Sequence, residues 1–411
     1  MRTGHSPHAF PAFPVYSSSF LSENELVLGG GGGASRSGIK NKLRLYNVGP
    51  ERSLELLDEF ELEKGEDAPM SMAADAKSRT VVCGVNSTLD KLEKGENQNC
   101  RVLAVKEHKL GLLGTQGTLP AGDLDDYQKV TVLSPDGALL AVAGGHDLSL
   151  LSYPSLSPVA KPIHTENEIY DATFSGTTLV VATTLDLLVY ALPTSTESPQ
   201  TPSPTKSRGK SKGKKAKSTK QPPGPSTLEL LRTIGVPESA GGAGAGTFRS
   251  ARYHPTNGDV LYSVINTSPP RTRKTKTPQR QAFVCKWNTK TWMVEKTRKV
   301  GDRGLTCFDV SADGKFLGFG SSDLTIGLLD ANTFSPIVTI LKAHEFPPTT
   351  IAFSPTSSLL VSGSADNSVR IVSVPQSLGN GGSWAIIFLI ITTLLVILLA
   401  ALAQKYLSGM Q

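Results

Sequence analysis

Four segments of this chain repeat one pattern of residues, and that repetition limits the possible folds more than any other feature. Each segment runs through a turn, an apolar strand, a few small residues, an aspartate and a second apolar strand; the aspartates are Asp147, Asp186, Asp323 and Asp366. The first two are 39 residues apart and the last two are 43 apart. A period of about 40–45 residues with four short strands per unit is typical of the blades of a WD-repeat β-propeller. We therefore expect an all-β, WD-repeat-like propeller.

The same period divides the body of the chain, residues 1–376, into seven blades. These cover approximately residues 15–62, 68–113, 127–156, 169–192, 228–300, 305–341 and 349–374. A propeller closes by pairing its first and last edges, so an N-terminal strand should complete the last blade. Phe10–Val15 is the apolar candidate for this closing strand.

Two basic segments interrupt the propeller and account for its positive charge. The formal net charge is +6, but residues 206–220 carry eight Lys or Arg and residues 271–280 carry five, without an acid in either. The rest of the chain is therefore mildly acidic, and no nucleic-acid partner is expected, because such a face spreads Lys and Arg over folded surface. The insert 194–226 is rich in Pro, Ser, Thr and Lys and should be disordered, and 266–281 should be a basic loop of blade five. The run 206–220 could be a nuclear localisation signal, a contact with anionic lipid or a solvated linker.

The C-terminal segment is the most apolar part of the chain. Trp384–Ala403 is twenty residues without a charge, and a helix rising about 1.5 Å per residue over that length spans a hydrocarbon core of ~30 Å. A buried core helix is the alternative. The first ten residues lack the apolar region of a signal peptide. We therefore expect a single C-terminal transmembrane helix, preceded by a linker at 377–383 and followed by a short luminal tail at 404–411, with the propeller in the cytosol.

A glycine-rich stretch from Gly29 to Asn41 lies between the expected second and third strands of blade one, Glu25–Leu28 and Lys42–Tyr46. Two phosphate-binding motifs match parts of it. A P-loop would need a lysine where Ile39 stands, and a dinucleotide-binding motif would have to open a helix, whereas a strand follows here. The stretch is therefore either a flexible hairpin tip or a loop that acts on another molecule.

The glycine motif, together with the propeller and the apolar C-terminal segment, resembles one known family. It reads Gly-Gly-Gly-Gly-x-x-x-x-Gly-Ile-x-Asn over residues 30–41, and Asp125-Asp126-Tyr127 and Lys342-Ala343-His344 add to the likeness. The pattern resembles the Sec-twelve family, which includes the prolactin regulatory element-binding protein of animals. The resemblance covers nearly the whole chain. It implies an endoplasmic reticulum guanine-nucleotide exchange factor for the Sar-type small GTPase that initiates COPII vesicle coats.

The resemblance also implies two roles for the glycine-rich loop, which in that family binds a potassium ion and engages the GTPase. The implied GTPase-engaging residues are Gly38, Ile39 and Asn41, and the implied potassium ligands are the backbone carbonyls of Gly30, Gly31, Gly32 and Gly33. Backbone carbonyls can replace the hydration shell of potassium, and a bound ion would order the loop before docking. The amide of Asn41 can donate and accept hydrogen bonds together. The alternative is that Asn41 only closes the hairpin through a local side-chain bond.

Such a regulator needs no nucleophile or general base, because it makes and breaks no covalent bond, so the chain is not expected to be an enzyme. The four cysteines and seven histidines show no metal-ligand spacing, and no nucleotide or organic cofactor is expected. The alternative function is a tail-anchored scaffold or tether without exchange activity, for which the glycine loop would be dispensable. The expected location is the endoplasmic reticulum membrane, crossed once, with the C-terminus in the lumen.

Overall fold

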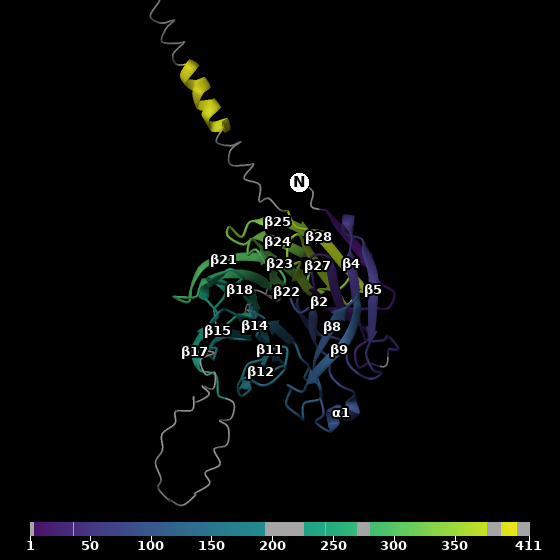
Figure 1. Ribbon diagram of the computed structural model, residues 1–411. Helices are drawn as coiled ribbons and strands as arrows, with labels where there is room; N and C mark the ends of the chain where they lie inside the picture. Colours follow the sequence, from purple (N-terminus) through teal and green to yellow (C-terminus); the bar gives the residue numbers. More distant parts are fainter. Residues whose placement is uncertain are drawn as a thin grey trace, which may run out of the picture. The chain divides into compact units, whose positions relative to one another are not determined.

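The computed structural model describes residues 4–35, 37–193, 226–242, 244–268, 280–375 and 388–400. The chain divides into two compact units, Met1–Val374 and Pro375–Gln411. In the described residues of the first unit, the strands form seven antiparallel sheets of four strands each (Figure 1). The all-β, seven-bladed propeller that the repetition predicts is thereby confirmed.

The innermost strands of neighbouring blades contact one another, and each blade extends outward from them. Blade one holds β2 (Val15–Phe20), β3 (Glu25–Gly30), β4 (Lys42–Val48) and β5 (Leu54–Glu61), and blade two holds β6 (Ser71–Asp75), β7 (Thr80–Gly84), β8 (Cys100–Lys106) and β9 (Lys109–Gln116). Blade three holds β10 (Val130–Leu133), β11 (Leu139–Ala143), β12 (Asp147–Ser152) and β13 (Ile163–His164), and blade four holds β14 (Ile169–Phe174), β15 (Thr178–Thr183), β16 (Asp186–Ala191) and β17 (Leu230–Gly235).

Blade five holds β18 (Gly246–His254), β19 (Asn257–Thr267), β20 (Gln281–Asn288) and β21 (Met293–Gly301), and blade six holds β22 (Leu305–Val310), β23 (Phe316–Ser321), β24 (Ile326–Asp330) and β25 (Pro336–Ile340). Blade seven holds β26 (Pro348–Phe353), β27 (Leu359–Ser364), β28 (Ser368–Ser373) and β1 (His5–Ala9). Among the described connections, three contain short helices: η1 (Pro50–Arg52), α1 (Leu89–Glu93) and η2 (Glu238–Ala240).

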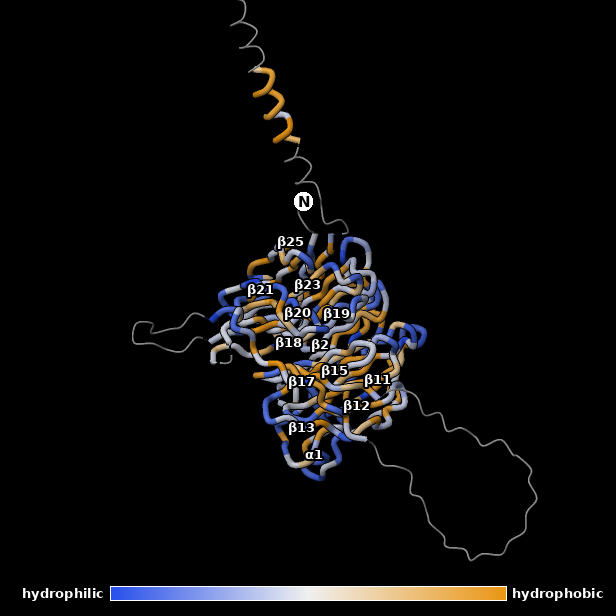
Figure 2. The backbone as a smooth tube through the Cα atoms, turned by 90° about the vertical axis from the view of Figure 1, so that its left-hand side faces the viewer, coloured by the Kyte–Doolittle hydropathy of each residue, from blue (hydrophilic) through white to orange (hydrophobic). Residues whose placement is uncertain are grey.

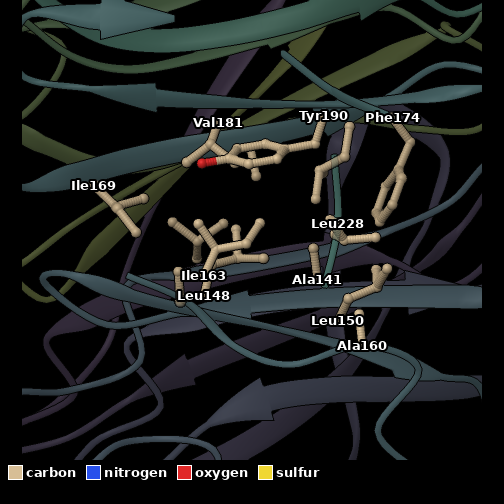
Figure 3. Packing of buried hydrophobic residues seen from close by; sticks show 14 residues of the cluster. Ala141, Leu148, Leu150, Ala160, Ile163, Ile169, Phe174, Val181, Tyr190 and Leu228 are labelled. Atoms are coloured by element: carbon tan, nitrogen blue, oxygen red, sulfur yellow. The ribbon is translucent and has the colours of Figure 1, made fainter. Parts of the chain in front are cut away.

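The hydrophobic core lies between neighbouring blades, because the second and third strands carry aliphatic residues on both faces. All six residues of β3 are buried. In one cluster, Leu148 and Leu150 of blade three lie opposite Val181 and Tyr190 of blade four (Figure 3). Hydrophobic stretches accordingly run through the strands, whereas many connections are hydrophilic (Figure 2). Burial of apolar surface, worth about 25 cal/mol per Å², therefore ties each blade to the next.

The ring is closed by β1, and the expectation that Phe10–Val15 closes it is wrong. β1 pairs antiparallel with β28 of the last blade. Pro11 and Pro14 lack the amide hydrogens that a ladder needs, and the Phe13 side chain is buried in the core. Residues 10–14 therefore connect β1 to β2.

The outer strand of blade four comes from the far side of the long insert, so blade five does not begin at Leu228 as expected. β17 pairs with β16, and blade five begins at Gly246. The insert 194–226 thus joins two strands of one blade, which the repeat period alone could not show. Residues 194–225 of this insert and 269–279 of the basic loop lie outside the described residues. Blade three is also longer than expected, since β13 lies beyond residue 156.

In the C-terminal unit, residues 388–400 are helical. Among the described residues, no helix combines the length and the apolar character that a membrane crossing requires. The expected span Trp384–Ala403 is described only in part, and the linker 377–383 and the tail 404–411 lie outside the described residues. The transmembrane helix stays a prediction.

Candidate functional site

The glycine-rich loop, residues 31–41, connects β3 to β4 and projects from one end of the propeller. The loop joins the second strand of its blade to the third. In blade seven, the third strand, β28, runs away from the corresponding connection, so β28 ends at the opposite end of the propeller. At that opposite end, the amide of Ser373 donates to the carbonyl of Gly4, 2.9 Å away. In Figure 1, α1 marks the loop-bearing end, because it occupies the equivalent connection of blade two. The loop and the residue after which the chain leaves the propeller, Val374, therefore lie at opposite ends.

Glycine is required at the base of the loop for steric reasons. Gly31 has a φ of +138°, a conformation that other residues rarely adopt. A Cβ atom on Gly31 would lie 2.3 Å from Oδ1 of Asn41, and one on Gly30 would lie 2.2 Å from the carbonyl oxygen of Pro14. The close packing of backbone and side chain at this point excludes any larger residue.

Asn41 fixes the base of the loop through both ends of its amide. Its Oδ1 accepts a hydrogen bond from the amide of Gly33 at 2.9 Å, and its Nδ2 donates to the carbonyl of Gly33 at 2.9 Å. Nδ2 also donates to the carbonyl of Glu66 at 2.7 Å, in the connection to blade two. The residue is 8% exposed, so these bonds lie largely out of water, where an unpaired group costs roughly 1–3 kcal/mol.

The three residues implied for GTPase contact do not occupy equivalent places. Gly38 is exposed, and no atom lies within 4 Å of the position of a Cβ there. Ile39 is half-buried, and its amide donates to Oγ of Ser37 at 3.3 Å. Asn41 instead lies in the base, bonded to Gly33, which matches the alternative that it closes the hairpin. Contact of all three residues with a GTPase stays a prediction.

The candidate potassium ligands offer oxygen atoms only. The carbonyl of Gly32 accepts a hydrogen bond from Oγ of Ser35, and the carbonyl of Gly33 accepts one from Asn41. A carbonyl oxygen has two lone pairs, so each can still accept a second partner. In the described part of the chain, no group of three or more His, Cys, Asp or Glu side chains could hold a metal ion. Potassium binding by the backbone carbonyls of the loop stays a prediction.

Two acidic residues that the sequence reasoning missed support the loop from the next connection. The carboxylate of Asp67 accepts a hydrogen bond from the amide of Ala34 at 3.0 Å. Glu66, only 3% exposed, pairs with Arg101 through two hydrogen bonds of 2.9 and 2.5 Å. No local pattern marks either residue, because their partners are 33 and 35 positions away in the chain.

Fold and site together define a WD-repeat propeller that carries a glycine-rich loop, the base of which is fixed by the hydrogen bonds of Asn41. The chain matches the family "WD domain, G-beta repeat" over residues 335–373. Raptor of Chaetomium thermophilum shares the fold in a solved structure, with a TM-score of 0.60 and 12% identity over 90% of this chain and 28% of that one. At this identity the likeness concerns the fold alone.

Two of the curated relatives that match are named guanine nucleotide-exchange factors, and a third is named a SEC12-like protein. The putative guanine nucleotide-exchange factor SED4 of Candida glabrata is 23% identical over 96% of this chain and 35% of its own length, and the guanine nucleotide-exchange factor SEC12 of that yeast is 22% identical over 90% and 72%. SEC12-like protein 2 of Arabidopsis thaliana is 30% identical over 29% of this chain and 27% of its own length. These names confirm the predicted resemblance to the Sec12 family. The chain spans 35% of the length of the SED4 relative and 72% of the length of the SEC12 relative.

Proposed function

We propose that this chain is a guanine-nucleotide exchange factor for a Sar-type small GTPase, acting at the endoplasmic reticulum membrane to start COPII coat assembly. The names of the SEC12 and SED4 relatives support exchange activity and a small GTPase as partner. The observation that carries the proposal is the glycine loop, whose base is fixed by Asn41 while Gly38 stays exposed. Such a base would hold the exposed tip in place for contact with a partner.

The mechanism is one of differential binding. A partner that binds the nucleotide-free GTPase more tightly than the loaded form shifts the population toward release. Switch segments of small GTPases are held by contacts to phosphate and magnesium. A projecting loop that occupies the place of a switch segment weakens those contacts, and a fixed base keeps the loop from yielding instead.

Asn41 acts in this scheme as a positioning residue, because it is bonded to the loop itself. Its hydrogen bonds to Gly33 and Glu66 set the direction in which Gly38 and Ile39 project. The half-buried Ile39 supplies an apolar contact next to the exposed Gly38. The carbonyls of Gly30, Gly31, Gly32 and Gly33 are the candidate ligands for potassium, which would order the loop when bound.

The membrane location rests on the uncharged stretch Trp384–Ala403. In this proposal the stretch crosses the endoplasmic reticulum membrane once, with the propeller in the cytosol and the C-terminus in the lumen. Protease added to intact microsomes should then digest the propeller. Full protection of the propeller would contradict this topology.

The deciding experiment measures the release of a fluorescent guanine nucleotide from a panel of small GTPases, with and without the full chain. We expect faster release from the Sar-type GTPase and no effect on GTPases of other classes. Potassium should be exchanged for sodium at equal ionic strength in a parallel series, since a loop ordered by potassium should lose activity there. Absence of acceleration on every GTPase would favour the scaffold or tether instead.

A further inference from the structure

The central channel contains a polar cavity that the exchange function does not use. Its volume is about 210 Å³, space for about seven waters at ~30 Å³ each. Lys129, Arg249 and Arg252 line it, and Asp171 is the one carboxylate among the lining residues that the structure describes. The cavity therefore has an excess of positive charge.

This charge is concentrated on one side of the channel. On the other side, inner-strand hydroxyls donate to a carbonyl of the next blade: Ser17 to Pro69 at 2.6 Å, Ser71 to Gln128 at 2.8 Å, Thr306 to Pro348 at 2.6 Å and Thr349 to Val15 at 2.6 Å. Between blades three and five, ion pairs replace these neutral bonds. Lys129 pairs with Glu168, and Arg252 pairs with Asp171.

Arg249 differs from the other two cations because no carboxylate of the described chain lies within ion-pair distance of it. Its Nε and Nη2 donate to the carbonyl of Thr306 at 3.3 and 3.1 Å. Its guanidinium carbon lies 5.0 Å from the ring centre of Tyr170. These contacts use two of its five N–H groups and fix the plane of the group, but they leave its full charge without a counter-charge. Arg249 is half-buried, so an anion in the cavity would supply the counter-charge that the described chain does not place within ion-pair distance.

We propose that this cavity binds a small oxyanion, namely phosphate or the phosphate group of a small monoester, with Arg249 as its principal ligand. The planar fork of arginine matches a phosphate group in a way that few other side chains do. Lys129 is the second cation, since an ammonium group has three donors and Glu168 takes one of them.

Neutral donors are also in place around the cavity. The hydroxyls of Ser18 and Thr350 lie 2.8 Å apart, and both residues line the cavity. Whichever hydroxyl donates in that bond, the other keeps its hydrogen for a ligand. An oxyanion bound by Arg249 and Lys129 would link blades three and five, on the side of the channel where ion pairs replace the neutral bonds between blades.

The test is the thermal unfolding of the full chain in increasing inorganic phosphate, with chloride adjusted to constant ionic strength. A ligand of the folded state raises the midpoint by an amount that grows with concentration relative to Kd. We expect a rise in the wild type that begins at low millimolar phosphate, the same rise in Arg232→Gln, and a shift at least tenfold toward higher phosphate in Arg249→Gln. Arg232 is the matched control, since it is an exposed arginine of the outer strand β17.

Phosphate also stabilises folded proteins in a general way, by exclusion from their surface. Equal rises in the wild type, Arg249→Gln and Arg232→Gln would be that general effect and would overturn the proposal. If Arg249→Gln does not fold, Arg249→Lys keeps the charge but loses the fork, and calorimetric titration of phosphate into it should show at least tenfold weaker binding. The same titration with glycerol phosphate separates a free phosphate from a monoester, and binding of neither by the wild type would also overturn the proposal.

Discussion

Blades one and seven solve the same problem, the connection from their second to their third strand, in opposite ways. In blade seven this connection is a tight turn around Asp366. The carboxylate of Asp366 accepts from the amide of Ser368 at 2.9 Å and from that of Glu345 at 2.6 Å. His344, whose side chain is 0% exposed, lies with its two ring nitrogens 2.8 and 2.9 Å from the hydroxyls of Ser368 and Ser362.

In blade one the equivalent connection is the loop 31–41, and Asn41 is its last residue, directly before β4. Both connections are anchored by a buried polar side chain, but the bonds of Asn41 reach only the base of the loop, at Gly33 and Glu66. Of the rest of the loop, Ala34 is held by Asp67 and Lys40 pairs with Glu61, whereas no atom lies within 4 Å of a Cβ position at Gly38. The comparison suggests a division of labour: the anchor of blade seven serves the stability of the ring, and the anchor of blade one serves the position of a projecting loop.

Asn41→Ala should separate the two roles most clearly. Removing the amide leaves the amide and carbonyl of Gly33 and the carbonyl of Glu66 without partners, at roughly 1–3 kcal/mol. Because about 1.4 kcal/mol is tenfold in rate, nucleotide release from the Sar-type GTPase should slow by about tenfold or more. Release kinetics with the folded variant check this.

The matched control is Asn266→Ala. The side-chain amide of Asn266, in blade five, makes the same pair of bonds with one residue of blade six: it accepts from the amide of Leu305 and donates to its carbonyl. It should lower the unfolding midpoint without slowing exchange. Equal exchange rates for Asn41→Ala and the wild type would remove Asn41 from the mechanism.

His344→Ala should show the reverse pattern. It leaves Ser362, Ser368 and the carboxylate of Asp366 with fewer partners inside the blade. The free energy of unfolding should fall by roughly 1–3 kcal/mol, measured by denaturant titration, while exchange by the folded fraction stays normal. His164→Ala is the control, since His164 is 71% exposed. A variant as stable as wild type would show that the blade-seven anchor has no structural importance.

How far the sequence could predict these two anchors depends on how local their bonds are. Asp366 and His344 were both visible, the first through the repeat and the second beside the family-like Lys342-Ala343. The glycine loop was also visible between its two strands. Glu66 was not, because its bond to Asn41 joins residues 25 positions apart and depends on the packing of two blades.

The strand order was only partly predictable for a similar reason. Periodicity finds strands that follow one another, and it located most blades correctly. Ring closure predicted that an N-terminal strand completes blade seven, but placed it at Phe10–Val15 instead of at β1. Periodicity could not show that β17 completes blade four, since β17 pairs with β16 across an insert. The charged side of the channel was equally hidden, because Lys129, Tyr170 and Arg249 meet there from three different blades.

Gly38→Ala should have a smaller effect than the loss of either anchor. Gly38 has a φ of +77°, so alanine there costs about 1–2 kcal/mol in backbone conformation, part of which an exposed loop relieves by shifting. We expect exchange to fall about threefold to tenfold at unchanged propeller stability. Gly176→Ala is the control, because its Cβ would also meet nothing within 4 Å and its φ is not positive. Equal exchange by the two variants would show that the conformation at Gly38 is unimportant.

The smallest expected effect is a pH dependence that only the blade-seven anchor should show. Burial lowers the pKa of His344 from its ordinary value of 6.5. The carboxylate of Asp366 acts to raise this pKa, and the positive charge of Arg370 lowers it further. The folded protein thus prefers the neutral imidazole. The contribution of neutral His344 to the free energy of unfolding is complete above pH 6.5. It declines as the pH falls below 6.5, because the unfolded chain takes up a proton first, and it stops declining below the lowered pKa of the folded state.

Unfolding free energies between pH 7.5 and 5.5 should therefore fall more steeply in the wild type than in His344→Ala. Asn41→Ala removes no titrating group and should keep the wild-type slope. Equal slopes in the wild type and His344→Ala would mean that protonation of His344 costs the folded blade nothing, and the contrast between the two anchors would then rest on their hydrogen bonds alone.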